Sequence, residues 1–424
     1  MAEKTVSEKA VLVTVDFRSL RRASDASELS RELAELSSGA GLTVVSNLLF
    51  KQDAPNAALF LGTGQAEKIK NEVLRRKADV VVFESDLSPS QQRNLEEAAG
   101  VKTIDRTQLI LDIFARRARS KEGKLQVELA QMKYLLPRLG GQGIYLSRLG
   151  GGVGTRGPGE QKLEVDRRRI REKITKFSRE LLEQQKKRKT AIDKKREKDL
   201  PLLALVGYTN AGKSSLFNRL TEAGVLVKDQ LFSTLDTTTR LAGLPGNQRV
   251  FLSDTVGFIR DLPHHLVESF KATLEETVQA DALLHVMDAS REDLSLIESA
   301  VLSVLSDIGA SEKKVYLVLN KADLLTEEKR AVMGDFLNRK NVFLISTRTG
   351  EGMDRLLRSI GSDLAASSLV STFFFSPNQY NLIDLAYKEG QVLDRKDEAG
   401  GTRLKIRLSP KIDAILRRKL QNGT

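Results

Sequence analysis

The chain of 424 residues has no cysteine, no tryptophan and only three histidines. Without cysteine it can form no disulfide, thiol nucleophile or cysteine-ligated metal site, which is typical of a protein in a reducing compartment. Three histidines, His264, His265 and His285, are too few to suggest a histidine-rich metal centre. No apolar run approaches the ~20 residues of a membrane-spanning helix, and the N-terminal MAEKTVSEKA lacks the apolar core of a signal peptide. We therefore expect a cytoplasmic protein without a membrane span, with peripheral membrane association as the alternative.

Acidic side chains are in deficit. The formal net charge is +12, which favours a polyanion or another acidic surface as partner. Residues 161–200 contain sixteen Lys or Arg and eight Asp or Glu, a net +8, and include the cluster Arg167, Arg168 and Arg169. Aromatic residues make up only 5% of the chain, so stacking on single-stranded bases is not favoured and structured RNA fits better. A solvated charged face is the simpler alternative.

One segment predicts phosphate binding. The residues after the apolar run Leu202–Val206 follow the pattern G-x-x-x-x-G-K-[ST], a strand–loop–helix site for phosphates. Glycines let the backbone approach phosphates closely, and N–H groups at the helix N-terminus supply partial positive charge. We expect Lys213 to reach the β- and γ-phosphates and the Ser214 hydroxyl to ligate Mg²⁺. The predicted loop residues are Gly207, Tyr208, Thr209, Asn210, Ala211, Gly212, Lys213, Ser214 and Ser215.

Two segments further along predict guanine as the base. Asn320-Lys321-Ala322-Asp323 follows the strand-like Val315–Leu319 and resembles the N-K-x-D segment of GTP-binding proteins. The Asp323 carboxylate can accept from both the ring N–H and the exocyclic amine of guanine, whereas adenine would leave this charge unpaired. Asn320 is expected to tie the base loop to the phosphate loop. Ser346, Thr347 and Arg348 follow another strand-like run and are expected to back the guanine.

Two segments between the phosphate loop and Asn320 are expected to respond to the γ-phosphate. Asp254, Thr255, Val256 and Gly257 follow the strand-like Val250–Ser253, where Asp254 would hold a water on Mg²⁺ and the Gly257 N–H would sense the γ-phosphate. Thr234 is expected to close over the γ-phosphate and Mg²⁺, and Thr237 and Thr238 are alternatives. Lys213, Gly257 and Thr234 are thus the expected catalytic residues of a GTP hydrolase that binds GTP and GDP.

The position after Gly257 is unusual for this kind of site. Many small GTPases have a glutamine there to orient the attacking water, and this chain has Phe258, which cannot hydrogen-bond to water. We therefore expect a slow intrinsic rate and a partner that completes the site. Related GTPases with an asparagine at the position of Asn210 use it to help bind K⁺, so K⁺ is a second candidate ion beside Mg²⁺.

The order of elements predicts an α/β protein with four domains. Residues 1–118 alternate strands with helices and predict a mostly parallel sheet, and residues 200–365 predict a doubly wound nucleotide-binding sheet. Residues 366–424 predict a small α+β domain in the order strand, helix, strand, helix. The predicted N-terminal strands are Val11–Val15, Leu42–Val45, Asp79–Phe83 and Val101–Ile104, and the predicted helices span about 25–38, 64–77, 89–99 and 106–118. Gly62–Gln65 is expected to start a helix, with a phosphate site as the weaker alternative.

Residues 119–199 predict a helical hairpin with a glycine-rich tip. Apolar residues recur at helical spacing on both sides of the tip, so the two helices are expected to pack antiparallel along these stripes. The tip, Gly140–Glu160, carries Arg148 and Arg156 and is expected to contact a partner, a bare linker being the alternative. The two stripes are Leu125, Leu129, Met132 and Leu136, then Ile170, Ile174, Phe177 and Leu181.

Several of these segments resemble signatures of the HflX family of GTPases. They are the glycine-rich run Gly151–Glu164, Leu87–Glu96, Gln126–Ala130, Leu231–Asp236 and Asp254–Phe258. The resemblance implies a monomer that binds the large ribosomal subunit, both rRNA and ribosomal proteins, and dissociates stalled or idle ribosomes. It also implies GTP hydrolysis stimulated by the ribosome, with ATP as an additional substrate in some members. By resemblance, Arg148, Arg156, Arg167, Arg168 and Arg169 are candidate ribosome contacts. The alternatives are a GTPase in large-subunit assembly and a nucleotide-gated adaptor of a protein partner.

Overall fold

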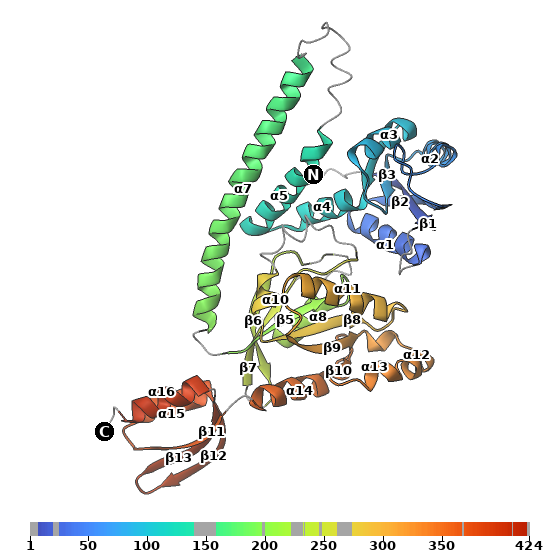
Figure 1. The fold of residues 1–424 in the computed structure, drawn as a ribbon. Coiled ribbons are helices and arrows are strands. Elements are labelled where there is room, and N and C mark those ends of the chain that lie inside the picture. The colour runs from blue at the N-terminus through green and yellow to red at the C-terminus, as the bar shows by residue number, and fades with distance from the viewer. Residues whose placement is uncertain are drawn as a thin grey trace, which may run out of the picture. The chain divides into compact units, whose positions relative to one another are not determined.

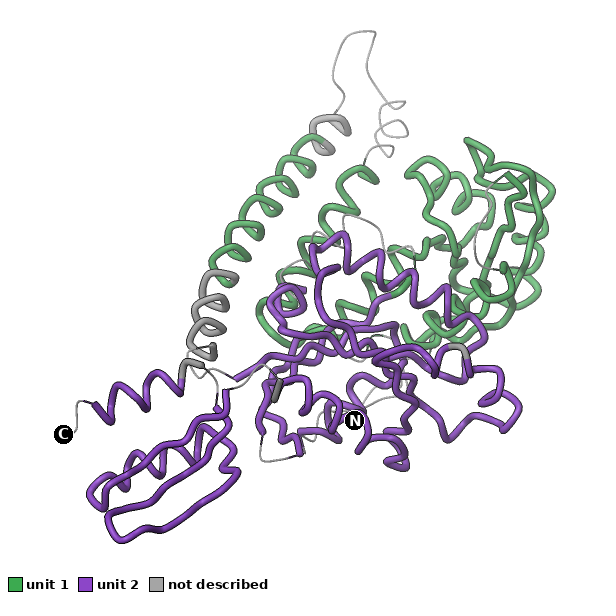
Figure 2. Tube along the Cα trace, turned by 60° about the horizontal axis from the view of Figure 1, so that its bottom comes forward, with its two compact units in different colours: residues 1–186, 228–236, 259–273 green, residues 187–227, 237–258, 274–424 purple. Residues whose placement is uncertain are grey.

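A computed structural model of the chain describes ten stretches of the sequence. They are residues 7–19, 25–139, 158–196, 200–221, 232, 234–245, 248–260, 274–366, 369–408 and 410–421. The chain divides into two compact units, which Figure 2 shows in green and purple. The first contains Met1–Lys186, Lys228–Asp236 and Ile259–Thr273, and the second contains Lys187–Val227, Thr237–Phe258 and Leu274–Thr424. The four domain boundaries expected from the sequence stay a prediction.

The first unit begins with a four-stranded parallel sheet in the order β2-β1-β3-β4. Figure 1 shows this sheet and its helices α1 to α4 in shades from blue to teal. Its central strand β1 buries successive apolar residues on both faces, as parallel strands covered by helices do. The elements are β1 (Lys9–Phe17), α1 (Ala26–Gly39), β2 (Thr43–Gln52), α2 (Thr63–Arg76), β3 (Val80–Phe83), α3 (Pro89–Ala99), β4 (Lys102–Asp105) and α4 (Arg106–Arg117). The predicted α/β fold is confirmed, and Gly62 is the N-cap residue of α2, so this segment starts a helix as expected.

Two long helices follow, α5 (Lys121–Arg138) and α7 (Pro158–Arg196). In α5, Leu125 and Leu129 of the predicted stripe are buried, but the buried face also includes Val127, Ala130 and Tyr134. This face packs against α4. The apolar side of α5 is therefore shared with the N-terminal sheet domain rather than reserved for the second helix of the hairpin. In α7, Leu181 of the second stripe is buried.

The second unit contains a six-stranded sheet in the order β10-β9-β8-β5-β7-β6, in which only β6 is antiparallel. Side chains of β5 alternate between two apolar cores: Leu203 and Leu205 face one, and Ala204 and Val206 face the other. The sheet is doubly wound, as predicted. Its elements are β5 (Leu202–Gly207), α8 (Lys213–Thr221), β6 (Thr238–Leu244), β7 (Gln248–Asp254), α10 (Glu275–Gln279), β8 (Ala282–Asp288), α11 (Leu294–Asp307), β9 (Lys314–Asn320), η1 (Ala322–Leu324), α12 (Glu327–Val332), α13 (Gly334–Leu337), β10 (Val342–Leu344) and α14 (Met353–Ala366).

The C-terminal part is a three-stranded antiparallel sheet with two helices. The strands β11 (Leu369–Phe375), β12 (Gln391–Glu398) and β13 (Gly401–Leu408) lie in the order β11-β13-β12, with α15 (Tyr380–Glu389) and α16 (Pro410–Gln421). The expected order of four elements is wrong by one strand, because β12 was not predicted. Six of its eight residues are exposed, and its sequence is QVLDRKDE. Charged side chains are common on edge strands, and the sequence has no alternation of apolar and polar residues that would predict a strand.

Candidate nucleotide-binding site

The predicted phosphate loop connects the central strand β5 to α8. It leaves the sheet at the carboxyl end of β5, where parallel α/β sheets bind ligands. Gly207, Asn210 and Gly212 have φ values of +141°, +61° and +94°, so the loop turns repeatedly through the left-handed region. A Cβ at Gly207 would come closer than 3.0 Å to the carbonyl oxygen of Val286. Glycine is therefore required there both by conformation and by space.

Lys213 and Ser214 occupy the first turn of α8 and are both 6% exposed. The Lys213 ammonium donates to the carbonyl oxygens of Gly207 (3.0 Å) and Tyr208 (2.7 Å). It therefore lies against the backbone of the predicted phosphate loop. Burial lowers the pKa of Lys213 to about 8, and the negative charge of Asp254 opposes this shift. A phosphate group at the loop would restore the charged form of this amine.

Asp254, Thr255 and Gly257 extend from β7 alongside the phosphate loop. The Ser214 hydroxyl donates to Asp254 Oδ2 at 2.8 Å, and both residues are buried. A Cβ on Gly257 would meet Thr209 Cγ2 at 2.8 Å and Lys213 Nζ at 3.0 Å, so only glycine fits beside the lysine. Phe258 is 5% exposed and packs in the core, and its backbone pairs with Gly207 and Thr209. Its ring therefore has a structural role in packing.

Asn320 bridges two loops, as expected. Its Nδ2 donates to the carbonyl oxygen of Ala211 at 2.9 Å, and its Oδ1 accepts from the backbone N–H of Thr347 at 3.0 Å. The bridge depends on Gly212, because a Cβ there would come closer than 3.0 Å to Asn320 Nδ2. One side chain thus joins the phosphate loop to the loop after β10.

The predicted base-recognition residues lie together after the ends of β9 and β10. Asp323 Oδ1 accepts from the Ser346 hydroxyl at 2.6 Å, and Asp323 Oδ2 lies 3.8 Å from the Arg348 guanidinium. Lys321 has a left-handed φ of +65°, and its ammonium lies 2.7 Å from Asp288 Oδ2. Asp288, the last residue of β8, was not predicted. The sequence signal that could have predicted Asp288 is a carboxylate at the end of a buried strand, as in Asp254.

Hard oxygen donors suited to Mg²⁺ lie together in Ser214 and Asp254. In the same phosphate loop, the buried Thr209 hydroxyl has no hydrogen-bond partner within the described part of the chain. These groups fit a magnesium–nucleotide. In the stretches that the structure describes, no group of three His, Asp or Glu side chains could hold a metal ion by itself, so nucleotide oxygens would have to complete such a site.

The threonine candidates for Mg²⁺ fall in different places. Thr238 is the first residue of β6 and is paired with Asp254 in the antiparallel ladder. Thr237 directly precedes it and, like Thr238, belongs to the second unit. Thr234 belongs to the first unit, whereas the phosphate loop belongs to the second. The assignment of Thr234 stays a prediction.

The structure describes three of the five candidate ribosome contacts, Arg167, Arg168 and Arg169. Arg168 and Arg169 of α7 are 71% and 70% exposed, with long ion pairs to Glu172 (3.8 Å) and Asp166 (3.7 Å). Pairs as exposed as these hold their charges weakly, which leaves both guanidinium groups available to phosphates. Arg167, on the same stretch of α7, is partly exposed. Arg148 and Arg156 lie outside the described residues.

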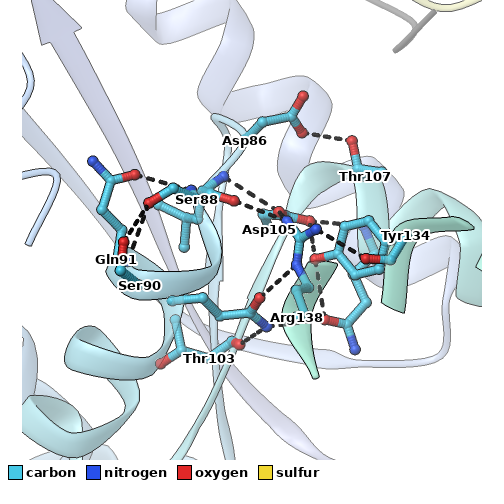
Figure 3. Close-up of polar contacts among 12 residues, drawn as sticks. Asp86, Ser88, Ser90, Gln91, Thr103, Asp105, Thr107, Tyr134 and Arg138 are labelled. Atoms are coloured by element: carbon cyan, nitrogen blue, oxygen red, sulfur yellow. Dashed lines mark hydrogen bonds and ion pairs between the residues drawn. The ribbon is translucent and has the colours of Figure 1, made fainter. Parts of the chain in front are cut away.

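A buried polar cluster fixes the end of α5 to the N-terminal sheet (Figure 3). Arg138 pairs with Asp105 at the end of β4 (3.0 Å) and donates to the carbonyl oxygen of Leu87 (2.8 Å). Tyr134 donates to Asp105 Oδ1 at 2.9 Å, and its ring lies under the Arg138 guanidinium. Burial raises the pKa of Asp105, and the hydrogen bond from the backbone N–H of Gln108 opposes the shift. Arg138, two residues before the glycine-rich tip, is thus anchored by an ion pair, a hydrogen bond and a contact with the Tyr134 ring.

Known proteins resemble this chain along nearly its whole length. Four family models match in succession: GTP-binding GTPase N-terminal (residues 27–115), GTP-binding GTPase Middle Region (117–196), 50S ribosome-binding GTPase (202–321) and HflX C-terminal domain (331–424). GTPase HflX of Caldanaerobacter subterraneus subsp. tengcongensis is 46% identical over 390 residues, 92% of this chain and 90% of that protein. The chain belongs to the HflX family of GTPases. GTPase HflX of Escherichia coli K12 is 41% identical over 403 residues, 95% of this chain and 93% of that protein.

As an HflX-family member the chain is a GTP-binding protein and a GTPase. A solved GTP-binding protein from Sulfolobus solfataricus in complex with GDP is 26% identical, with a TM-score of 0.43 and coverage of 84% of this chain and 98% of that one. In the described ranges, no helix is long and apolar enough to cross a membrane.

Proposed function

We propose that this HflX-family protein binds the large ribosomal subunit in the cytoplasm and dissociates stalled or idle ribosomes as a monomer. The observation that carries the proposal is the exposed basic surface of α7, in a chain whose GTPase region matches a family described as 50S ribosome-binding GTPase. Arg167, Arg168 and Arg169 would contact rRNA or ribosomal proteins, with Arg148 and Arg156 at the tip of the hairpin. Such contacts to phosphate supply affinity without reading sequence.

The proposed nucleotide site is centred on the phosphate loop between β5 and α8. Lys213 would contact the β- and γ-phosphates, Gly257 would sense the γ-phosphate through its N–H, and Asp323 would select guanine. Ser214 and Thr234 would ligate Mg²⁺ directly and Asp254 through a water. Bound Mg²⁺ would neutralise the charge that develops on the phosphates. The backbone of Ser346, Thr347 and Arg348 would support the base.

Hydrolysis is proposed to be slow in the free protein. Phe258 is committed to core packing, so no side chain at this position orients the attacking water. A ribosomal group, or K⁺ held with the help of Asn210, would supply the missing contribution. ATP is proposed as an additional substrate, and competition between ATP and GTP for turnover tests that proposal.

The decisive experiment is a density gradient of intact ribosomes incubated with this protein and a non-hydrolysable GTP analogue. We expect free subunits to appear and the protein to migrate with the large subunit, whereas with GDP the ribosomes stay intact. GTP turnover should rise when mature ribosomes are added. Binding only to precursor particles would favour a role in large-subunit assembly. Absence of both splitting and stimulation would favour a nucleotide-gated adaptor of a protein partner.

A further inference from the structure

The segment that carries Thr234 is attached to the N-terminal unit on both sides of that residue. On one side, Phe232 is 1% exposed, and its ring meets that of Phe114 in α4 edge to face, with centroids 4.7 Å apart. Phe232 has a φ of +54°, a left-handed conformation that a bulky residue adopts only when its surroundings impose it. The Phe232 side chain is thus held against α4.

On the other side, Asp236 binds the start of α5. Its carboxylate accepts from the backbone N–H groups of Arg119 (2.9 Å) and Ser120 (2.8 Å) and from the Ser120 hydroxyl. Ser120 is the N-cap residue of α5, and its hydroxyl in turn accepts from the N–H of Gly123 at 2.8 Å. A carboxylate is favoured at this end of a helix, where N–H groups lack partners and the helix dipole is positive.

Gly123 has a spatial role in this contact. It lies in the first turn of α5, where alanine would form a better helix. A Cβ at this position would come closer than 3.0 Å to Asp236 Oδ1, so any other residue would displace the carboxylate. Gly123 and Asp236 thus fit together closely, although they lie 113 residues apart in the sequence.

We propose that Asp236 is a positioning residue of the GTPase, which couples the Thr234 segment to the first turn of α5. Two residues of extended chain span at most about 7 Å. Thr234 therefore cannot move far between a triphosphate and a diphosphate state without pulling Asp236 or breaking its bonds to α5. The nucleotide is in this way sensed at the base of the helical linker. The inference rests on the proposed role of Thr234 and is independent of the ribosome as partner.

Amide hydrogen exchange of the full-length protein without ribosomes tests the contact between Asp236 and α5. The exchange rates of the amides of residues 119–125 should differ by at least about fivefold between a non-hydrolysable GTP analogue and GDP. The reason is that opening of the start of α5 is linked to the segment that carries Thr234. Asp236→Asn and Gly123→Ala should both lose this difference, the first through charge and the second through space. Gly64→Ala is the matched control: it places alanine in the first turn of α2 with nothing within 4 Å.

Kinetics separate positioning from folding. Asp236→Asn should lower kcat for GTP by about tenfold through misplacement of Thr234 and leave GDP affinity within about twofold. Gly123→Ala keeps the charge of Asp236, so a matching loss there comes from displacement of the carboxylate rather than from loss of its charge. The proposal is overturned if the wild type shows no nucleotide-dependent exchange at 119–125, or if both variants retain it. If the variants lose the difference but Thr234→Ala keeps it, another residue of the segment senses the nucleotide and the proposed role of Thr234 is wrong.

Discussion

Lys213 shows how a single side chain connects burial to ligand binding. Its amine is buried beneath the phosphate loop and bonded to two carbonyl oxygens, and its pKa is lowered to about 8 by that burial. With phosphates in the proposed position, their charge would raise this pKa, so nucleotide binding would take up a proton near pH 8. The protonated form of Lys213 would be the one that binds, and nucleotide affinity would be lost as pH rises through about 8.

We predict that GDP affinity is constant between about pH 7 and pH 8 and then weakens by up to about tenfold per pH unit. Titration with a fluorescent GDP across this range measures the effect, and calorimetry at pH 8 in buffers of different ionisation enthalpy should show uptake of about half a proton. In Lys213→Arg, the guanidinium stays charged, so the pH dependence should vanish even where affinity is lower. Affinity that does not change up to about pH 9 would contradict the assignment.

At the scale of one helix, α5 contains a polar residue that its packing does not satisfy. Gln126 is fully buried, and neither its amide oxygen nor its amide nitrogen has a hydrogen-bond partner within the described ranges. An unsatisfied buried amide is destabilising by about 1–3 kcal/mol, whereas an apolar side chain of similar shape avoids that penalty. Gln126 is thus a less stable choice at this buried position of α5 than an apolar residue of similar shape would be.

We predict that Gln126→Met raises the free energy of opening of α5 by about 1 kcal/mol, measured by hydrogen exchange of its amides. Gln92→Met is the matched control, because the Gln92 amide donates to the carbonyl oxygen of Thr103 and accepts from Arg138. That substitution should lower stability. A destabilised Gln126→Met would mean that the buried amide has a bonded partner in solution.

Elements with a strong local pattern were predictable from the sequence, and those defined by distant partners were not. The phosphate loop and the bridge made by Asn320 follow from motifs whose spacing reflects loop geometry. Strand β12 was not predicted, because an edge strand needs no apolar alternation. The predicted stripe of α5 included the buried Leu125 and Leu129 but not Val127, Ala130 and Tyr134, because the packing of α5 on α4 is a tertiary contact that helical spacing alone does not show. Asp236 was visible only as part of a signature, since its partner Ser120 lies 116 residues away.

At the scale of the whole molecule, charge decides how the protein meets its proposed partner. We predict that ribosome binding weakens with added salt and that the double substitution Arg168→Glu and Arg169→Glu flattens the log–log slope by about 0.7–0.9 for each phosphate that is no longer neutralised. Sedimentation over a salt series measures the slope. Lys68→Glu with Lys70→Glu in α2 changes the net charge equally, and both lysines are exposed. If the two double variants bind alike, total charge rather than the surface of α7 governs affinity.

The discontinuity of the first unit affects how it can be made. Arg260 bonds to Glu32 across 228 residues, and Glu32 also pairs with Arg106 in the same buried network. At elongation rates of about 5–20 residues per second, roughly 10–45 s separate the synthesis of Glu32 from that of Arg260. During this interval the nascent N-terminal sheet has only Arg106 of these two arginines for the Glu32 carboxylate. Completion of the unit must therefore wait for the middle of the GTPase sequence to leave the ribosome.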